Sequence, residues 1–170
     1  MASVTYPPEA SGLRKTKTYH YENVTQPKLL TGITDENGIR FATYTYNSAG
    51  QVTETKHFAT PTTEVNKHTL SYPYVGRTTV TDPLGTVRNY DYTNILNYDA
   101  VTGISQPCAS CGGSNAQAMT YDANRNVATR TDFNGNKPCY AYDLTRNLET
   151  FRAEGMGGAA CPARDRKSVV

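Results

Sequence analysis

The most chemically reactive side chains of this chain are its four cysteines, Cys108, Cys111, Cys139 and Cys161. The first two form a C-x-x-C motif, which is typical of zinc sites, redox-active thiols and structural disulfides. Zinc would need four converging thiolates, and the long gaps from Cys111 to Cys139 and from Cys139 to Cys161 are loose for a small site. Thioredoxin-like chemistry would need a βαβ unit, and none is visible. We favour structural disulfides or free thiols, with the connectivity left open.

The three histidines are candidate acid–base groups, but they form no catalytic pattern. They lie on or beside expected strands, and no serine or cysteine nucleophile accompanies them in a recognisable motif. We interpret these histidines, which are His20, His57 and His68, as exposed or packed residues of a sheet. We therefore expect no catalytic residue, no cofactor, no metal ligand and no enzyme activity.

Three aspartates recur in the pattern Asp-x-x-Gly, and we expect them to form turns. Aspartate at the first position accepts a backbone hydrogen bond two residues on, and glycine takes the positive φ that closes a bulged hairpin. As acid–base pairs or calcium ligands they fit poorly, because they lie in separate hairpins and their spacing does not match an EF-hand loop. The three segments are Asp35 to Gly38, Asp82 to Gly85 and Asp132 to Gly135.

A tyrosine followed by an acidic or amide residue opens a second series of turns. Tyr121-Asp122 recurs further along the chain as Tyr142-Asp143, and Tyr46-Asn47 begins a segment of the same form. The two series alternate about every 10 residues, which leaves strands of the common length of about 5–7 residues. A full cycle of about 20 residues indicates a repeat array, and we assign these residues to structural turns.

Composition and patterning predict an all-β fold of stacked antiparallel β-hairpins that form a twisted, curved sheet. Hydrophobic residues make up only 37% of the chain, but it holds 13 tyrosines and many threonines, which favour strands. Residues 39–46 alternate as a strand does, with Ile39 and Phe41 on one face and Arg40 and Ala42 on the other. The net charge of +2 is spread without a basic stripe, so we expect no nucleic-acid partner, and no apolar run suits a membrane span.

Tyrosines also occur in pairs two residues apart, so that each pair shares one face of the expected sheet. Such pairs serve as a structural seam between strands, or as an exposed aromatic platform for carbohydrate. We favour the seam. The pairs are Tyr44 and Tyr46, Tyr72 and Tyr74, Tyr90 and Tyr92, and Tyr140 and Tyr142.

The spacing of the turns divides the chain into three parts. We expect an irregular N-terminal segment over residues 1–14, repeats over 15–160, and a tail over 161–170. The repeat spacing slips at 58–64, where about five residues are extra, and again at a predicted loop insertion near 101–116. Residues 165–170 match one reading frame of a widely used sequencing adapter, and we interpret them as a sequencing artefact.

The alternation of the two turn series resembles the YD-repeat proteins, also called RHS (rearrangement hot spot) proteins. The segments that carry the resemblance are 30–38, 80–85 and 120–154. The resemblance implies a long twisted sheet of stacked hairpins that winds into a hollow shell, of which this chain would be an interior fragment. In such proteins the shell typically encloses a C-terminal variable domain, often a toxin. Some members cleave themselves through an aspartyl-protease-like motif, which we do not find in this sequence.

The resemblance implies a non-enzymatic structural segment that encapsulates or displays a C-terminal effector (toxin) domain. Its partners would be the remainder of the parent shell and the encapsulated domain. The parent would be a bacterial secreted or cell-surface protein, although this fragment carries no signal peptide. The alternative is a cell-surface module that binds carbohydrate or protein through its tyrosine-rich face.

Overall fold

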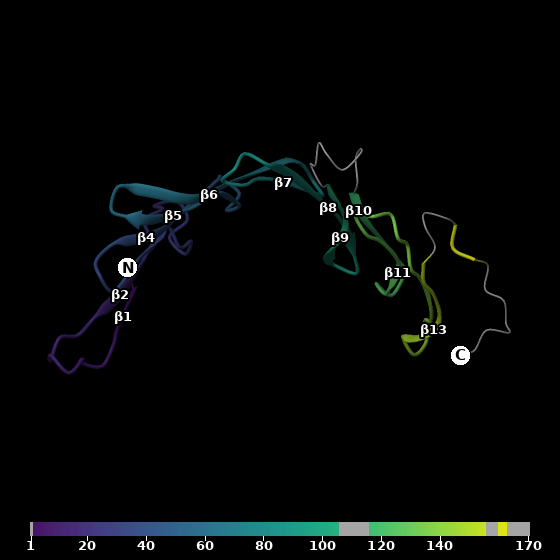
Figure 1. Cartoon of the computed structure of the whole chain (residues 1–170), viewed down its shortest axis with the longest axis horizontal. Coiled ribbons are helices and arrows are strands. Elements are labelled where there is room, and N and C mark those ends of the chain that lie inside the picture. The colour runs from purple at the N-terminus through teal and green to yellow at the C-terminus, as the bar shows by residue number, and fades with distance from the viewer. Residues whose placement is uncertain (1, 106–115, 156–159, 163–170) are drawn as a thin grey trace. The chain divides into compact units, whose positions relative to one another are not determined.

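The computed structural model describes residues 2–105, 116–155 and 160–162, and in these ranges the regular structure is entirely β (Figure 1). The strands are β1 (Ala2–Thr5), β2 (Thr16–His20), β3 (Gly32–Thr34), β4 (Arg40–Tyr46), β5 (Val52–Thr60), β6 (Thr63–Tyr74), β7 (Arg77–Thr81), β8 (Val87–Ile95), β9 (Tyr98–Ser105), β10 (Ala116–Tyr121), β11 (Val127–Thr131), β12 (Cys139–Asp143) and β13 (Leu148–Ala153). No helix long and apolar enough to cross a membrane occurs in these ranges.

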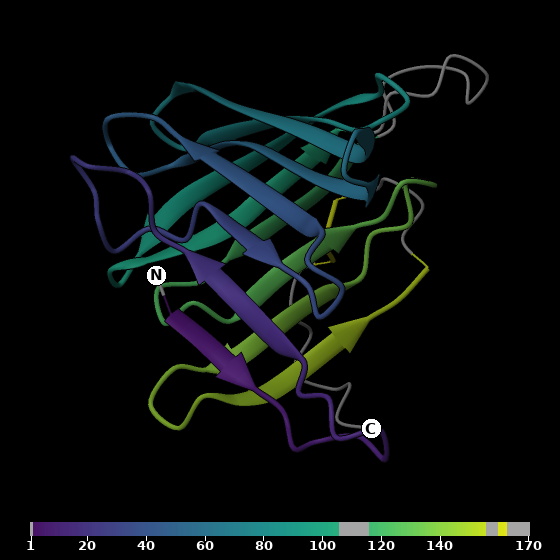
Figure 2. The same ribbon diagram turned by 90° about the vertical axis from the view of Figure 1, so that its left-hand side faces the viewer.

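The strands are hydrogen-bonded in the order of their numbers, so each one pairs with its neighbours in the chain. The chain divides into two compact units, Met1–Ser71 with Val80–Thr86, and Tyr72–Thr79 with Val87–Val170. Within the first unit, β1 to β5 lie side by side in Figure 2, and every pairing among them is antiparallel. The predicted all-β fold of antiparallel hairpins is confirmed.

The same type of turn closes hairpins of both predicted series. At Asp35 the Oδ1 atom accepts the amide N–H of Asn37 and that of Ile39, each at 2.9 Å. The amide of Gly38 donates to the Asp35 carbonyl at 3.1 Å, and Gly38 has a φ of 78°. The pattern is a type I turn followed by a left-handed residue, which is a common way to close a hairpin with a bulge.

The same hydrogen bonds recur at four further positions. An Asx oxygen accepts the amides of the second and fourth following residues, and the third following residue has a positive φ. The two predicted series therefore use the same type of turn, which occurs alternately at the two ends of successive strands. These four turns begin at Asn47, Asp82, Asp122 and Asp132.

The turn at Asp143 differs by one residue. Asp143 accepts the amide of Thr145 at 3.0 Å, but the residue with positive φ is Asn147, with a φ of 53°. Asp143 pairs with Leu148, which leaves four residues in the loop, whereas three residues separate Asp122 from its partner across the hairpin. The Tyr142 segment, expected to copy the Tyr121 segment, is thus a longer variant of it.

Two segments that were expected to be irregular or a loop contain strands. The N-terminal segment 1–14, expected to be irregular, contains β1, which pairs in register with β2 from Ala2↔Tyr19 to Thr5↔Thr16. Of the loop insertion expected near 101–116, residues 101–105 belong to β9 and residue 116 begins β10, and residues 106–115 lie outside the described residues. In both places β-branched residues favour a strand, and Pro, Gly and Ser nearby had suggested a loop.

The extra residues at 58–64 lengthen two strands and do not form a long loop. β5 has 9 residues and β6 has 12, and only Pro61 and Thr62 separate them. Register shifts between Thr55 and His57 and between Phe58 and Thr60 absorb the extra length. Both strands are longer than the turn spacing predicts, because the pairing extends past the usual turn position.

Few side chains are fully buried. Among the described residues the buried hydrophobic ones are Ala42, Ala100 and Cys139. Phe41 is 41% exposed and stacks on His57, with ring centroids 4.7 Å apart. Stability must therefore come mainly from hydrogen-bonded turns, ladders and half-buried cross-strand pairs, and less from a central core.

Replacing Asp35 with alanine tests whether the side-chain oxygen holds the turn. Asp35→Ala removes the acceptor of two backbone amides, and we expect a loss of about 1–2 kcal/mol in the free energy of unfolding, measured by urea titration. Asp35→Asn is the matched control, because Asn47 makes the same two bonds, and it should change the free energy by less than about 0.5 kcal/mol. Equal losses in the two variants would contradict the assignment.

Candidate functional site

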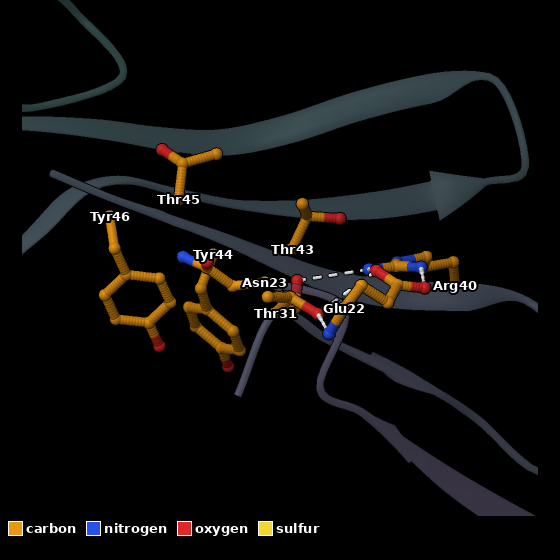
Figure 3. Close-up of a pocket in the computed structure, with 8 residues that line it drawn as sticks. All are labelled: Glu22, Asn23, Thr31, Arg40, Thr43, Tyr44, Thr45 and Tyr46. Carbon is orange, nitrogen blue, oxygen red and sulfur yellow. Dashed lines mark hydrogen bonds and ion pairs between the residues drawn. The ribbon is translucent and has the colours of Figure 1, made fainter. Parts of the chain in front are cut away.

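An open pocket of about 390 Å³ lies on β4 and the segment before β3 in the first unit (Figure 3). Tyr44 and Tyr46 point to one side of β4, whereas Thr43 and Thr45 point to the other side. The remaining lining residues are polar, namely Glu22, Asn23, Thr31 and Arg40.

A charged pair forms one end of the pocket. Arg40 donates two hydrogen bonds to Glu22, from Nη1 to Oε1 at 2.9 Å and from Nη2 to Oε2 at 2.7 Å. The Thr31 hydroxyl donates to Glu22 Oε2 at 3.1 Å, and Arg40 Nη2 also donates to the Thr31 carbonyl. The hydrogen bonds from Arg40 hold the pKa of the Glu22 carboxyl at about 2, far below its ordinary value. The pair is charged at neutral pH and its groups bind each other.

Glycine at position 32 makes room for this pair. A Cβ atom built on Gly32 would overlap the Arg40 guanidinium, so the arginine lies across a backbone position without a side chain. Gly32 pairs with Thr43 across β3 and β4 and with His20 across β2 and β3. The antiparallel register of three strands therefore brings together residues that are 18 positions apart in the sequence.

His20 lies beside the charged pair. Its Nε2 atom is 2.7 Å from the Thr34 hydroxyl, and its Nδ1 atom is 3.5 Å from Glu22 Oε1. The Nδ1 atom is buried and makes no hydrogen bond that meets geometric criteria. His20, expected to be an exposed or packed sheet residue, is thus a packed residue that lies next to a carboxylate of the pocket.

Tyr46, one of the two tyrosines of the pocket, connects two segments of the chain through its hydroxyl. The Tyr46 hydroxyl donates to the carbonyl of Leu30 at 2.6 Å, which joins the end of β4 to the chain just before β3. Burial raises the pKa of Tyr46. In the second unit the Tyr121 hydroxyl makes the matching bond to the Val101 carbonyl at 2.7 Å. Tyr46 and Tyr121, which each precede a turn, therefore connect neighbouring hairpins.

A shift of register accompanies each of these tyrosines. The pairing of β4 with β5 shifts between Thr45 and Tyr46, and that of β10 with β11 shifts between Thr120 and Tyr121. The β12–β13 pairing shifts next to Tyr142 in the same way. A bulge increases the local twist and re-aims the side chain. This accounts for the reach of the tyrosine towards the preceding hairpin.

Neighbouring turns of the second unit also bind each other. Asn124 Nδ2 donates to the Leu144 carbonyl at 2.6 Å and to Asn147 Oδ1 at 2.8 Å. Asn126 Nδ2 donates to the same Asn147 oxygen at 3.2 Å. The guanidinium of Arg125 lies over the Tyr98 ring, 4.2 Å from its centroid. These contacts align one hairpin end with the next.

The structure describes two of the four candidate cysteines. Cys139 and Cys161 form a disulfide, with a Cα–Cα distance of 5.8 Å. Cys108 and Cys111 lie outside the described residues. Within those residues, no three His, Cys, Asp or Glu side chains come together in a way that could hold a metal ion.

The sequence reasoning missed the pair of Glu22 and Arg40 and the asparagine contacts between turns. The pair has no local signal, because its two residues meet only through the register of three strands. The asparagines did carry a signal, since both Tyr-Asp turns have asparagine four residues after the aspartate, at Asn126 and Asn147.

A comparison with protein families matches residues 28–62 to the family model described as RHS Repeat. The match identifies residues 28–62 as an RHS repeat. The matched residues contain β3, β4 and β5, with both pocket tyrosines and Arg40.

Among solved structures, one match is the Tc holotoxin pore of Photorhabdus luminescens, in a form with a point mutation in its TccC3 component. The sequences of this chain and that protein are 13% identical, and the TM-score between their structures is 0.39. The match covers 85% of this chain and 9% of that chain, so this chain spans less than a tenth of its length. No curated protein matches the sequence.

The bonding of Glu22 predicts a pH-dependent stability. Its pKa is about 2 in the folded chain and 4.5 ordinarily, so the stabilisation is complete above pH 4.5 and is lost as the pH falls towards 2. In Glu22→Gln we expect a shallower fall of the urea midpoint across this window than in the unsubstituted chain.

The control is Arg40→Gln, which removes the donor and should flatten the same part of the profile. Combining the two substitutions should add no further change, because both act on one interaction. A Glu22→Gln chain that keeps the full acid dependence of the unsubstituted chain would contradict this account.

Proposed function

We propose that this RHS-repeat chain is a non-enzymatic wall segment of a larger repeat shell, which encloses or displays a C-terminal effector domain. The observation that carries the proposal is the repetition of one turn at alternate strand ends, with few buried side chains among the described residues. A sheet of this kind grows by adding hairpins, and it suits a wall better than a self-contained globule. The resemblance to YD-repeat shells supports the effector domain, a toxin, as the enclosed partner.

The pocket supports a structural role more than ligand binding. The groups that would recognise a ligand are already used inside the chain, since Tyr46 binds Leu30, and Arg40 binds Glu22. A ligand would have to compete with these bonds, which costs binding free energy. The alternative, a carbohydrate- or protein-binding module with a tyrosine-rich face, would depend mainly on the Tyr44 ring.

The same bonding argues against catalysis at this pocket. Glu22 is held ionised by Arg40, and the hydroxyl that His20 contacts belongs to Thr34. A general base must reach a reacting group that a substrate can also reach, and the Thr34 hydroxyl is already bonded to His20. The role that we propose for the pair of Arg40 and Glu22 is structural: it holds β4 against the segment before β3.

Protease accessibility tests the shell. In a longer chain that contains these repeats followed by its own C-terminal region, that region should be cleaved at least about tenfold more slowly than the same region expressed alone. The rates are compared by gel electrophoresis with a protease of broad specificity at matched concentrations.

The matched control carries Asp35→Asn, which keeps the turn and should keep the protection. A second variant, Asp35→Ala, weakens the wall and should raise the cleavage rate. Equal rates for the attached and the separate C-terminal region would contradict enclosure.

A further inference from the structure

The sequence contains two Asn-Gly dipeptides, and both lie in turns of the type described above. They are Asn37-Gly38, between β3 and β4, and Asn134-Gly135, between β11 and β12. Both asparagines are exposed. Asparagine before glycine is prone to lose its side-chain amide spontaneously, because glycine has no Cβ to shield the amide nitrogen that attacks the side chain. Each dipeptide is therefore a candidate for covalent modification without an enzyme.

The folded turn opposes this reaction. In each turn the glycine amide donates to the carbonyl of the first turn residue, Gly38 to Asp35 at 3.1 Å and Gly135 to Asp132 at 3.0 Å. The glycine nitrogen must lose its proton before it can attack, so this hydrogen bond has to break first. Deamidation therefore proceeds from the opened turn, and its rate follows how often the end of the hairpin opens.

The turn between β3 and β4 is well supported by its surroundings. The two strands share three pairs of residues, and one of them, Thr34↔Arg40, lies directly beside the turn. Glu36, inside the turn, forms an ion pair with Lys17 Nζ of β2 at 3.0 Å. Arg40 is also bonded to Glu22. Opening of this turn must break contacts to a third strand as well as those of the hairpin itself.

The turn between β11 and β12 has less support. The register of these two strands contains a single pair of residues. Between that pair and the turn, the Arg130 amide donates to the Pro138 carbonyl at a long 3.3 Å, and Pro138 has no N–H with which to donate in return. One additional bond, from Asn136 Nδ2 to Asp132 Oδ2 at 2.8 Å, lies within the turn and does not extend the strand pairing. This hairpin end should therefore open more often than the other.

We propose that Asn134 is a site of spontaneous deamidation, because the β11–β12 hairpin opens readily, and that the β3–β4 hairpin suppresses the same reaction at Asn37. After the turn opens, hydroxide removes the proton of the Gly135 amide, and the nitrogen attacks Cγ of Asn134. The new N–Cγ bond closes a succinimide ring, the Cγ–Nδ2 bond breaks, and Nδ2 takes a proton from water and leaves as ammonia. Water then opens the ring. Attack at the main-chain carbonyl gives isoaspartate, and attack at Cγ gives aspartate.

Either product changes the turn. A carboxylate replaces the amide at position 134, in the same turn as Asp132, whose pKa is lowered by its hydrogen bonds with Asn136, so two negative charges lie close together. Isoaspartate also adds one carbon to the main chain, and the two amides that Asp132 accepts no longer have the spacing that fits its oxygen. Because the hairpin depends on this turn and on a single pair, we expect the modification to loosen β12 from β11.

Peptide mapping by mass spectrometry over time tests the proposal. The full chain is incubated at mildly alkaline pH, folded in buffer or unfolded in urea, and deamidation and isoaspartate are measured at both asparagines. In urea the two sites should react at similar rates, since each is an open Asn-Gly dipeptide. In the folded chain both should react more slowly, and Asn134 should react faster than Asn37 by on the order of tenfold, because additional contacts hold the β3–β4 turn.

Two variants change one hairpin each. Lys17→Gln releases Glu36 and should speed deamidation at Asn37 while leaving Asn134 unchanged. Pro138→Ala supplies the missing N–H opposite β11 and should slow the reaction at Asn134 alone. Equal rates at the two sites in the folded chain, or a faster reaction at Asn37, would overturn the proposal. An Asn134 that stays intact while the unfolded chain reacts fully would overturn it as well.

Amide hydrogen exchange of aged and fresh protein tests the structural consequence. After ageing, exchange in β12 (Cys139–Asp143) should become faster, whereas exchange in β4 and β5 of the first unit should not change. The matched control is Asn134→Ser, which has no side-chain amide to lose and should keep β12 protected through the same incubation. Equal loss of protection in the aged Asn134→Ser chain would contradict the link between the modification and the loosened hairpin.

Discussion

The hydrogen bonds of one Asx oxygen to two backbone amides are the constraint on which the rest of this structure depends. The oxygen fixes the turn, and a residue with positive φ closes it, so the two strands leave in one antiparallel register. Most of these third positions hold glycine, but Arg125 takes a φ of 67° at the same place. Because the turn is complete within five residues, a short sequence pattern can specify each hairpin without a large core.

Connections between hairpins come from side chains next to the turns. Tyr46 and Tyr121 each donate a hydroxyl to a carbonyl of the preceding hairpin, and Asn124 joins two adjacent turns. Such bonds act at the ends of strands, where the ladder itself is weakest. The charged pair of Arg40 and Glu22 has the same effect near the pocket. The array is thus held by local turns along the chain and by polar contacts between neighbours.

The hairpins could be predicted from the sequence because their turn residues act locally, as the segment from Asp35 to Gly38 shows. The strand over residues 101–105 was missed because Gly103 and the nearby Pro107 outweighed the β-branched residues in a local interpretation. The bond from Arg40 to Glu22 could not be predicted, since it depends on the register of three strands. Pairing of the cysteines was equally beyond the sequence, because it depends on where the chain lies after β13.

Backbone amide exchange at the turns, resolved residue by residue by NMR, tests the central claim most directly. The amides that the Asx oxygens accept lie in mostly exposed turns, where an unbonded N–H would exchange at the rate of a free peptide. The account predicts slowed exchange at the second and fourth positions of all five turns. These amides belong to Asn37 and Ile39, Ala49 and Gln51, Leu84 and Thr86, Asn124 and Asn126, and Asn134 and Asn136. Exchange at the free-peptide rate at these positions would contradict it.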